Sequence, residues 1–105
     1  MKINVSDILR STIAAFHNEG LQIFSLLQQQ FLIKEKVELS FEGIERCSTQ
    51  FLNASIGKMY LLYETEMVEE FLKINTGNLP NLLSKIEAVK ENAIISKEDP
   101  ELADV

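Results

Sequence analysis

The chain has 105 residues, of which 46% are hydrophobic and 25% are charged, so its length and composition fit one folded domain and exclude wholesale disorder. Acidic residues outnumber basic residues by 16 to 10, and the formal net charge of −6 disfavours binding to a nucleic-acid backbone. There is one cysteine, no apolar run of the roughly 20 residues that a membrane span needs, and no signal-peptide pattern at the start, so we expect a cytoplasmic protein that binds neither nucleic acid nor a membrane.

Two short strands are predicted at the start of the chain. Ile3 and Val5 alternate with polar neighbours, and this period of two is typical of a strand. The apolar run at 12–16 predicts a second strand, and the polar residues 17–20 indicate a turn. The two strands allow an antiparallel hairpin over residues 2–16, although the pattern does not establish that they pair.

Helical and strand periods then alternate along the middle of the chain. A single apolar stripe predicts an amphipathic helix over 21–33, and the alternation at 37–41 predicts a strand that ends at Gly43. A second apolar stripe predicts a helix over 48–64, with Ser48 or Thr49 as its N-cap.

The last third of the chain repeats this order. Acidic residues at 64–70 suggest a turn, residues 71–75 a strand, and the apolar spacing from Leu79 a helix that fades by Ile95. Half of the net charge lies in residues 96–105, for which we expect a flexible acidic tail. The single domain therefore spans residues 1–95.

The predicted order β-β-α-β-α-β-α indicates an α/β fold. Strands that alternate with helices favour a sheet of about four strands, mixed or mostly parallel, covered by about three helices. At least one face of so small a sheet must be covered by helices.

Groups that carry out catalysis are scarce. The chain has one histidine, His17, and one cysteine, Cys47, for which we expect a surface position and a packed position, respectively. The glycines are dispersed rather than gathered in a phosphate loop, and the carboxylates have no metal-ligand spacing. We therefore expect no enzyme activity, no metal and no cofactor.

One segment carries a family resemblance. Its three motifs are Phe41-Glu42-Gly43-Ile44, the run Ser48-Thr49-Gln50-Phe51-Leu52-Asn53, and Ile56-Gly57-Lys58. This pattern of a strand, an acid-glycine turn and a helix that opens on hydroxyl residues is similar to the STAS domain (sulphate transporter and anti-sigma factor antagonist). It most closely resembles the short STAS-like family of uncharacterised bacterial proteins.

The resemblance implies a regulatory domain that works by docking onto a protein partner. In anti-sigma factor antagonists a partner kinase of the GHKL ATPase type phosphorylates a serine or threonine at the start of this helix. Thr49 matches the acceptor and Ser48 matches the Asp that usually precedes it, so the resemblance implies phosphorylation at Thr49, with Ser48 as the other candidate. Gln50 and Phe51 stand where those antagonists usually have Ser-Gly, which is a departure from their pattern.

The residues of this helix suggest a contact surface, and each has an alternative reading. Ser48 and Thr49 also suit a plain helix cap, and the mid-helix Gly57 fits either a close helix approach or a partner contact. The residues that we expect on the partner-binding surface are Ser48, Thr49, Gln50, Asn53, Gly57, Tyr60 and Leu61.

Two functions from other classes remain open. One alternative to the docking domain is a structural subunit that assembles as a homodimer or larger homo-oligomer. The other is a small-molecule or anion sensor that uses the helix N-terminus at Ser48-Thr49.

Overall fold

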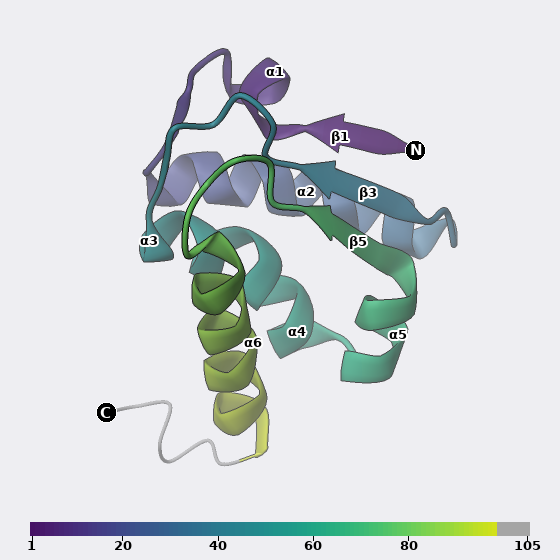
Figure 1. Cartoon of the computed structure of the whole chain (residues 1–105). Helices are drawn as coiled ribbons and strands as arrows, with labels where there is room; N and C mark the ends of the chain where they lie inside the picture. The colour runs from purple at the N-terminus through teal and green to yellow at the C-terminus, as the bar shows by residue number, and fades with distance from the viewer. Residues whose placement is uncertain (99–105) are drawn as a thin grey trace.

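The computed structural model describes residues 1–98, and a small parallel sheet lies at its centre (Figure 1). The strands of this sheet, in spatial order, are β1 (Lys2–Asn4), β3 (Val37–Ser40) and β5 (Leu72–Asn75). The register places Leu39 between Ile3 and Ile74, and Glu38 between Lys2 and Lys73. One face of the sheet is therefore apolar and the other is polar, because successive side chains point to opposite faces.

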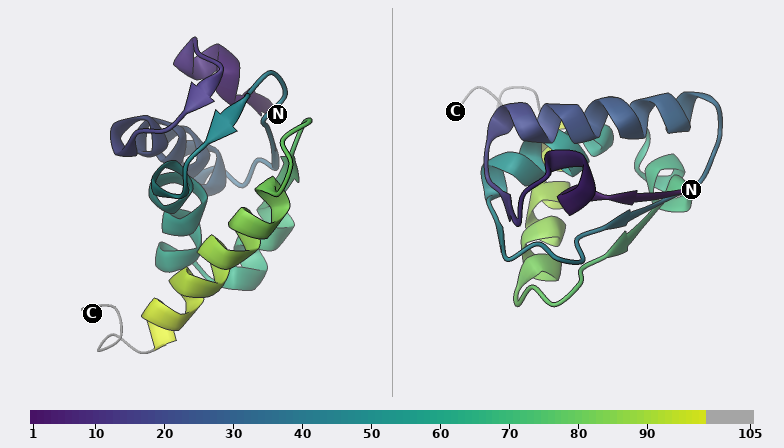
Figure 2. Two further views of the ribbon diagram at one scale, coloured as in Figure 1. Left: turned by 60° about the vertical axis from the view of Figure 1, so that its left-hand side comes forward. Right: turned by 90° about the horizontal axis from the view of Figure 1, so that it is seen from above.

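The helices pack around the apolar face (Figures 1 and 2). In chain order they are α1 (Val5–Leu9), α2 (His17–Leu32), α3 (Thr49–Leu52), the π-helical turn η1 (Asn53–Gly57), α4 (Lys58–Leu62), α5 (Thr65–Phe71) and α6 (Leu82–Glu98). Leu39 of β3 and Phe41, which directly follows β3, are fully buried, as are Leu27 of α2 and Ile56 of η1. The predicted α/β class is confirmed, as is the expectation that helices cover a face of the sheet.

The first hairpin that the sequence allowed does not form. The second strand, β2 (Ile13–Ala14), pairs in parallel with β4 (Arg46–Cys47), while β1 pairs in parallel with β3. The short helix α1 lies between β1 and β2 and carries the chain from one ladder to the other. The alternation at the start predicted a strand correctly, but its partner lies 36 residues away in the sequence, beyond the reach of a local pattern.

A continuous helical segment over residues 49–62 forms the centre of the helical layer. It lies between α2 and α6 (Figure 2). Each of these neighbours approaches it at a glycine. A Cβ on Gly20 of α2 would lie 2.6 Å from the Phe51 carbonyl oxygen, and a Cβ on Gly57 would lie 2.8 Å from Val89 Cγ1 of α6. Glycine therefore permits close contact on two opposite sides of this segment.

The π-helical turn within this segment surrounds a buried serine. The Ser55 hydroxyl donates to the carbonyl oxygen of Phe51 at 2.8 Å, and Ser55 is fully buried. A hydroxyl bonded to the preceding turn competes with the regular backbone ladder, and single π-helical turns occur where that ladder is locally widened.

Two polar stretches that we predicted as turns are helical. Residues 17–20 form the first turn of α2, in which the Glu19 carboxylate accepts from the Phe16 backbone N–H at 3.2 Å. The acidic stretch at 64–70 largely belongs to α5, which buries Val68 and Phe71. In α5, burial of these two side chains outweighs the polar composition, whereas residues 17–20 are helical as the start of a helix whose buried face begins at Gly20.

The C-terminal helix α6 begins and ends later than predicted. It starts at Leu82 rather than at Leu79, so Pro80 lies before the helix, and it continues to Glu98 rather than fading by Ile95. The expected acidic tail at 96–105 lies mostly outside the described residues.

Candidate functional site

Ser48 fixes the start of the central helical segment. Its Oγ accepts a hydrogen bond from the Phe51 backbone N–H at 3.0 Å and donates one to the Ala15 carbonyl oxygen at 2.6 Å. The first bond is a helix N-cap, as one of the two sequence alternatives predicted. The second bond ties this cap to the strand segment that precedes α2, so both functions of the hydroxyl are already used.

The β2–β4 ladder brings two helix N-termini together. Ala14 lies beside Cys47 in the parallel register, and the Ser48 backbone N–H donates to the Ala14 carbonyl oxygen at 2.9 Å. The chain then enters α2 after Phe16 and α3 after Ser48, so these helices begin side by side. At the start of α2 the Glu19 carboxylate accepts from the Ala15 and Phe16 N–H groups, so a negative charge already lies at this helix N-terminus.

Three side chains on the first turns of the central segment face solvent. They are Thr49, Gln50 and Asn53, which are all exposed, whereas Phe51 and Leu52 between them are buried. Within residues 1–98, the Thr49 hydroxyl makes no hydrogen bond. Thr49 is therefore accessible, in contrast to Ser48.

Phe16 adds an apolar element to this polar face. Its side chain is 67% exposed, and it immediately follows Ala15, whose carbonyl oxygen accepts the Ser48 hydroxyl. An exposed aromatic side chain beside polar groups is common at protein interfaces. We call the exposed group formed by Phe16, Thr49, Gln50 and Asn53 the Thr49 surface.

The structure corrects the expected position of two residues farther along the segment. We expected Gly57 and Tyr60 to point away from the core, but both are buried, with Tyr60 only 6% exposed. The reason is that α6 covers this side of the segment, with Gly57 against Val89 and the Lys90 ammonium 5.6 Å from the centre of the Tyr60 ring. Burial also raises the pKa of Tyr60. Leu61 is 43% exposed.

The acid-glycine turn at 41–44 is held by hydrogen bonds to both neighbouring strands. Glu42 Oε1 accepts from Asn75 Nδ2 at 2.9 Å and from Lys2 Nζ at 3.2 Å. These bonds, with that from Ser40, lower the pKa of Glu42; the Lys2 hydrogen bond has the largest effect. The chain turns at Gly43 with φ +83°, a conformation that suits glycine. Through Glu42, this motif links the carboxyl ends of β3 and β5 to the first residue of β1.

The motifs that form this turn, the cap and the central segment lie within one family match. Residues 19–82 match the family described as a STAS-like domain of unknown function (DUF4325). The chain belongs to this STAS-like family. The match runs from the first turn of α2 to the start of α6, and so includes Gly20 with its contact to Phe51, Gly57 itself and the cap from Ser48 to Phe51, whereas Val89, which Gly57 contacts, lies beyond it. No curated protein and no solved structure matches the chain.

Few side chains of the STAS-like domain near the Thr49 surface are nucleophiles, bases or possible metal ligands. Cys47 is buried, as predicted, and burial raises its pKa to about 11, so its thiolate is scarce at neutral pH. The Lys85 ammonium donates to the Cys47 carbonyl oxygen at 3.2 Å, and His17 is exposed at the first residue of α2. Among residues 1–98, no group of His, Cys, Asp and Glu side chains is placed to hold a metal ion, and no helix has the length and apolar character of a membrane span.

Phe16 is the residue of the Thr49 surface that we did not predict. Its place at the end of the apolar run at 12–16 predicted the last residue of a strand. The available signal was the polar run His17-Asn18-Glu19 directly after it, because a residue at an N-cap has extended backbone and its side chain need not follow the buried stripe of the helix.

Proposed function

We propose that this STAS-like domain is a non-catalytic regulatory module that docks onto a partner protein through the Thr49 surface. The observation that carries the proposal is the exposure of Phe16 and Thr49 together, beside a serine whose hydroxyl is fully engaged. An exposed aromatic anchor with a polar rim suits a protein partner.

A phosphate on Thr49 is the regulatory step that we propose for this surface. Thr49 is the first residue of α3, and a negative charge at a helix N-terminus is favourable, so phosphorylation there is compatible with the fold. The Lys85 ammonium lies near the start of the same helix through its bond to Cys47. A kinase-like ATPase of the GHKL type is the partner that the family resemblance suggests, and the accessible hydroxyl supports Thr49 over Ser48 as the acceptor.

The anion-sensor alternative has less support from the geometry. The cavities near the sheet are lined by residues of α2, α5, β1, β3 and β5, or by residues of α4, α5, β5 and α6. Ser48 and Thr49 line none of these cavities, and the exposed Phe16 is better suited to a protein than to a small anion.

Capture from an extract of the source cells tests the docking proposal. We expect Phe16→Asp and Thr49→Glu to reduce recovery of the partner on the immobilised domain by at least about tenfold, because the first puts a charge in place of the aromatic anchor and the second puts a charge beside it, where we propose the phosphate. Both changes are at exposed positions and suit a helix start, so the domain should stay folded. Glu91→Lys, an exposed change on α6, is the control and should leave recovery unchanged.

The outcomes separate the two parts of the proposal. If Phe16→Asp and Glu91→Lys capture the same proteins in the same amounts, the Thr49 surface is not the docking site. If Thr49→Glu and Thr49→Ala both bind the partner as the wild type does, the proposal that phosphorylation of Thr49 regulates docking is wrong. The proposal that the domain docks through this surface is then unaffected.

A further inference from the structure

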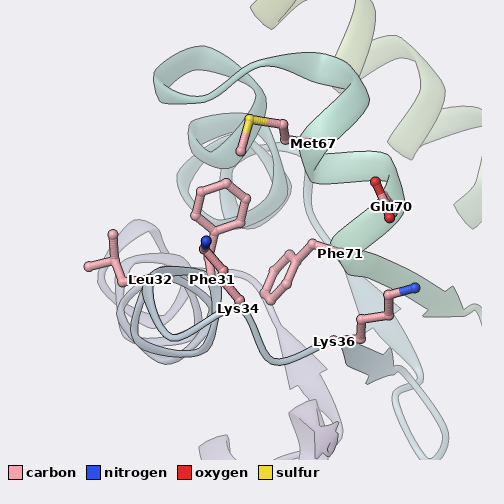
Figure 3. Close-up of a pocket in the computed structure, with 7 residues that line it drawn as sticks. All are labelled: Phe31, Leu32, Lys34, Lys36, Met67, Glu70 and Phe71. Carbon is pink, nitrogen blue, oxygen red and sulfur yellow. The ribbon is translucent and has the colours of Figure 1, made fainter.

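A second exposed apolar region lies at the other end of α2. A groove of about 400 Å³ opens between the C-terminal end of α2 and α5 (Figure 3). Phe31 and Phe71 meet edge to face inside it, with ring centres 5.2 Å apart, while Leu32 and Met67 at its margins are 66% and 53% exposed. Such adjacent exposed apolar side chains mark an interaction site.

The two walls of the groove carry opposite charges. Lys34 follows α2 on one wall and Glu70 stands on α5 on the other, while Lys36 lies on the Glu70 side, just before β3 (Figure 3). Within the described part of the chain, neither Lys34 nor Glu70 forms an ion pair. Each wall therefore offers an apolar residue beside an unpaired charge, with the sign reversed from one wall to the other.

The backbone holds Lys34 at this margin in an unfavourable conformation. Its N–H donates to the Phe31 carbonyl oxygen at 3.1 Å, and the Glu35 N–H donates to the Gln30 carbonyl oxygen at 3.0 Å, so α2 ends in a Schellman motif. Lys34 has φ 61°, where glycine is the usual residue. A lysine at this position costs the fold some stability but places an ammonium group beside the groove.

We infer that the occupant of this groove is a second copy of the chain, in a two-fold symmetric dimer. In a two-fold interface, both copies use the same surface and are related by a rotation of 180°. Lys34 of each copy therefore faces Glu70 of the other, and the apolar residues of the two grooves meet at the centre. A foreign partner with one sign of charge would be repelled by one of the two walls, and this favours self-association.

The dimer leaves the Thr49 surface free. The groove lies at the C-terminal end of α2 and Phe16 lies at the N-terminal end, and a helix of 16 residues is about 24 Å long. Each dimer therefore presents two docking surfaces, and this inference goes beyond the proposed function because it stands whether or not Thr49 binds a partner.

Charge reversal followed by sedimentation analysis tests the dimer. We expect the wild type to sediment as a reversible dimer, and Lys34→Glu or Glu70→Lys to weaken the dimer by at least about tenfold, since each single change creates two like-charge pairs. The double variant Lys34→Glu/Glu70→Lys restores the pairing with its sign reversed and should dimerise within about threefold of the wild type. Glu91→Lys should dimerise as the wild type does, and circular dichroism should show every variant folded.

Two results would overturn the inference. One is a wild type that remains monomeric at every concentration up to the millimolar range. The other is a double variant that dimerises no better than the single variants, because that would show that Lys34 and Glu70 do not face each other across the interface.

Discussion

Replacement of Gly20 by alanine is expected to destabilise the domain by about 3 kcal/mol, because the added Cβ has no room between α2 and the central helical segment. That atom would lie 2.6 Å from the Ala54 Cβ and 2.6 Å from the Phe51 carbonyl oxygen. Alanine improves helix propensity by about 1 kcal/mol over glycine, but this gain is smaller than the cost of separating two packed helices. Urea unfolding monitored by circular dichroism measures the difference.

A matched change in the same helix controls for helix propensity. Ser25 is exposed on α2, so Ser25→Ala should alter the free energy of unfolding by less than about 0.5 kcal/mol. If Gly20→Ala is as stable as Ser25→Ala, then α2 and the central segment are not in the close contact that the structure describes.

The second large effect is expected at Ser48. Removing its hydroxyl in Ser48→Ala eliminates the helix cap to Phe51 and the 2.6 Å bond to the Ala15 carbonyl oxygen. We expect a loss of about 2 kcal/mol, since a lost cap costs about 1 kcal/mol and an unpaired, partly buried carbonyl adds a comparable amount. The same unfolding experiment measures it.

Thr49→Ala is the matched control for Ser48→Ala. The Thr49 side chain is exposed and does not cap the helix, so its removal should change the unfolding free energy by less than about 0.5 kcal/mol. A larger loss for Thr49→Ala than for Ser48→Ala would show that the two hydroxyls have exchanged the roles that we assign to them.

The sequence predicted best the elements whose periodicity is local. The strand at 37–40 and the helical segment at 49–62 were recognisable because their side chains alternate or recur with the period of a buried face. Pairing was not recognisable, because β2 and β4 each contribute two residues to a ladder whose halves are far apart in the chain. The short helix α5 also escaped prediction, since burial of Val68 and Phe71 rather than composition stabilises it.

The sequence predicted the exposed residues of the candidate site but not the residues that a second neighbouring helix covers. An amphipathic stripe assumes one buried face, and this places Thr49, Gln50 and Asn53 on the surface, where the structure has them. The segment has a second buried face against α6, which covers Gly57 and Tyr60, and a single stripe does not reveal a second neighbour. Gly20 was predicted as a turn residue, because the local pattern does not reveal the second helix that it contacts.

The most direct measurement of the central claim is site-specific photo-crosslinking inside the source cells. A photoreactive amino acid replaces the exposed Gln50 on the Thr49 surface or, as a control, the exposed Asn92 on α6. The docking account predicts a discrete adduct with one protein from position 50, lost when Phe16→Asp is introduced, and no such adduct from position 92. Equal adducts from both positions, or an adduct from position 50 that persists in Phe16→Asp, would contradict it.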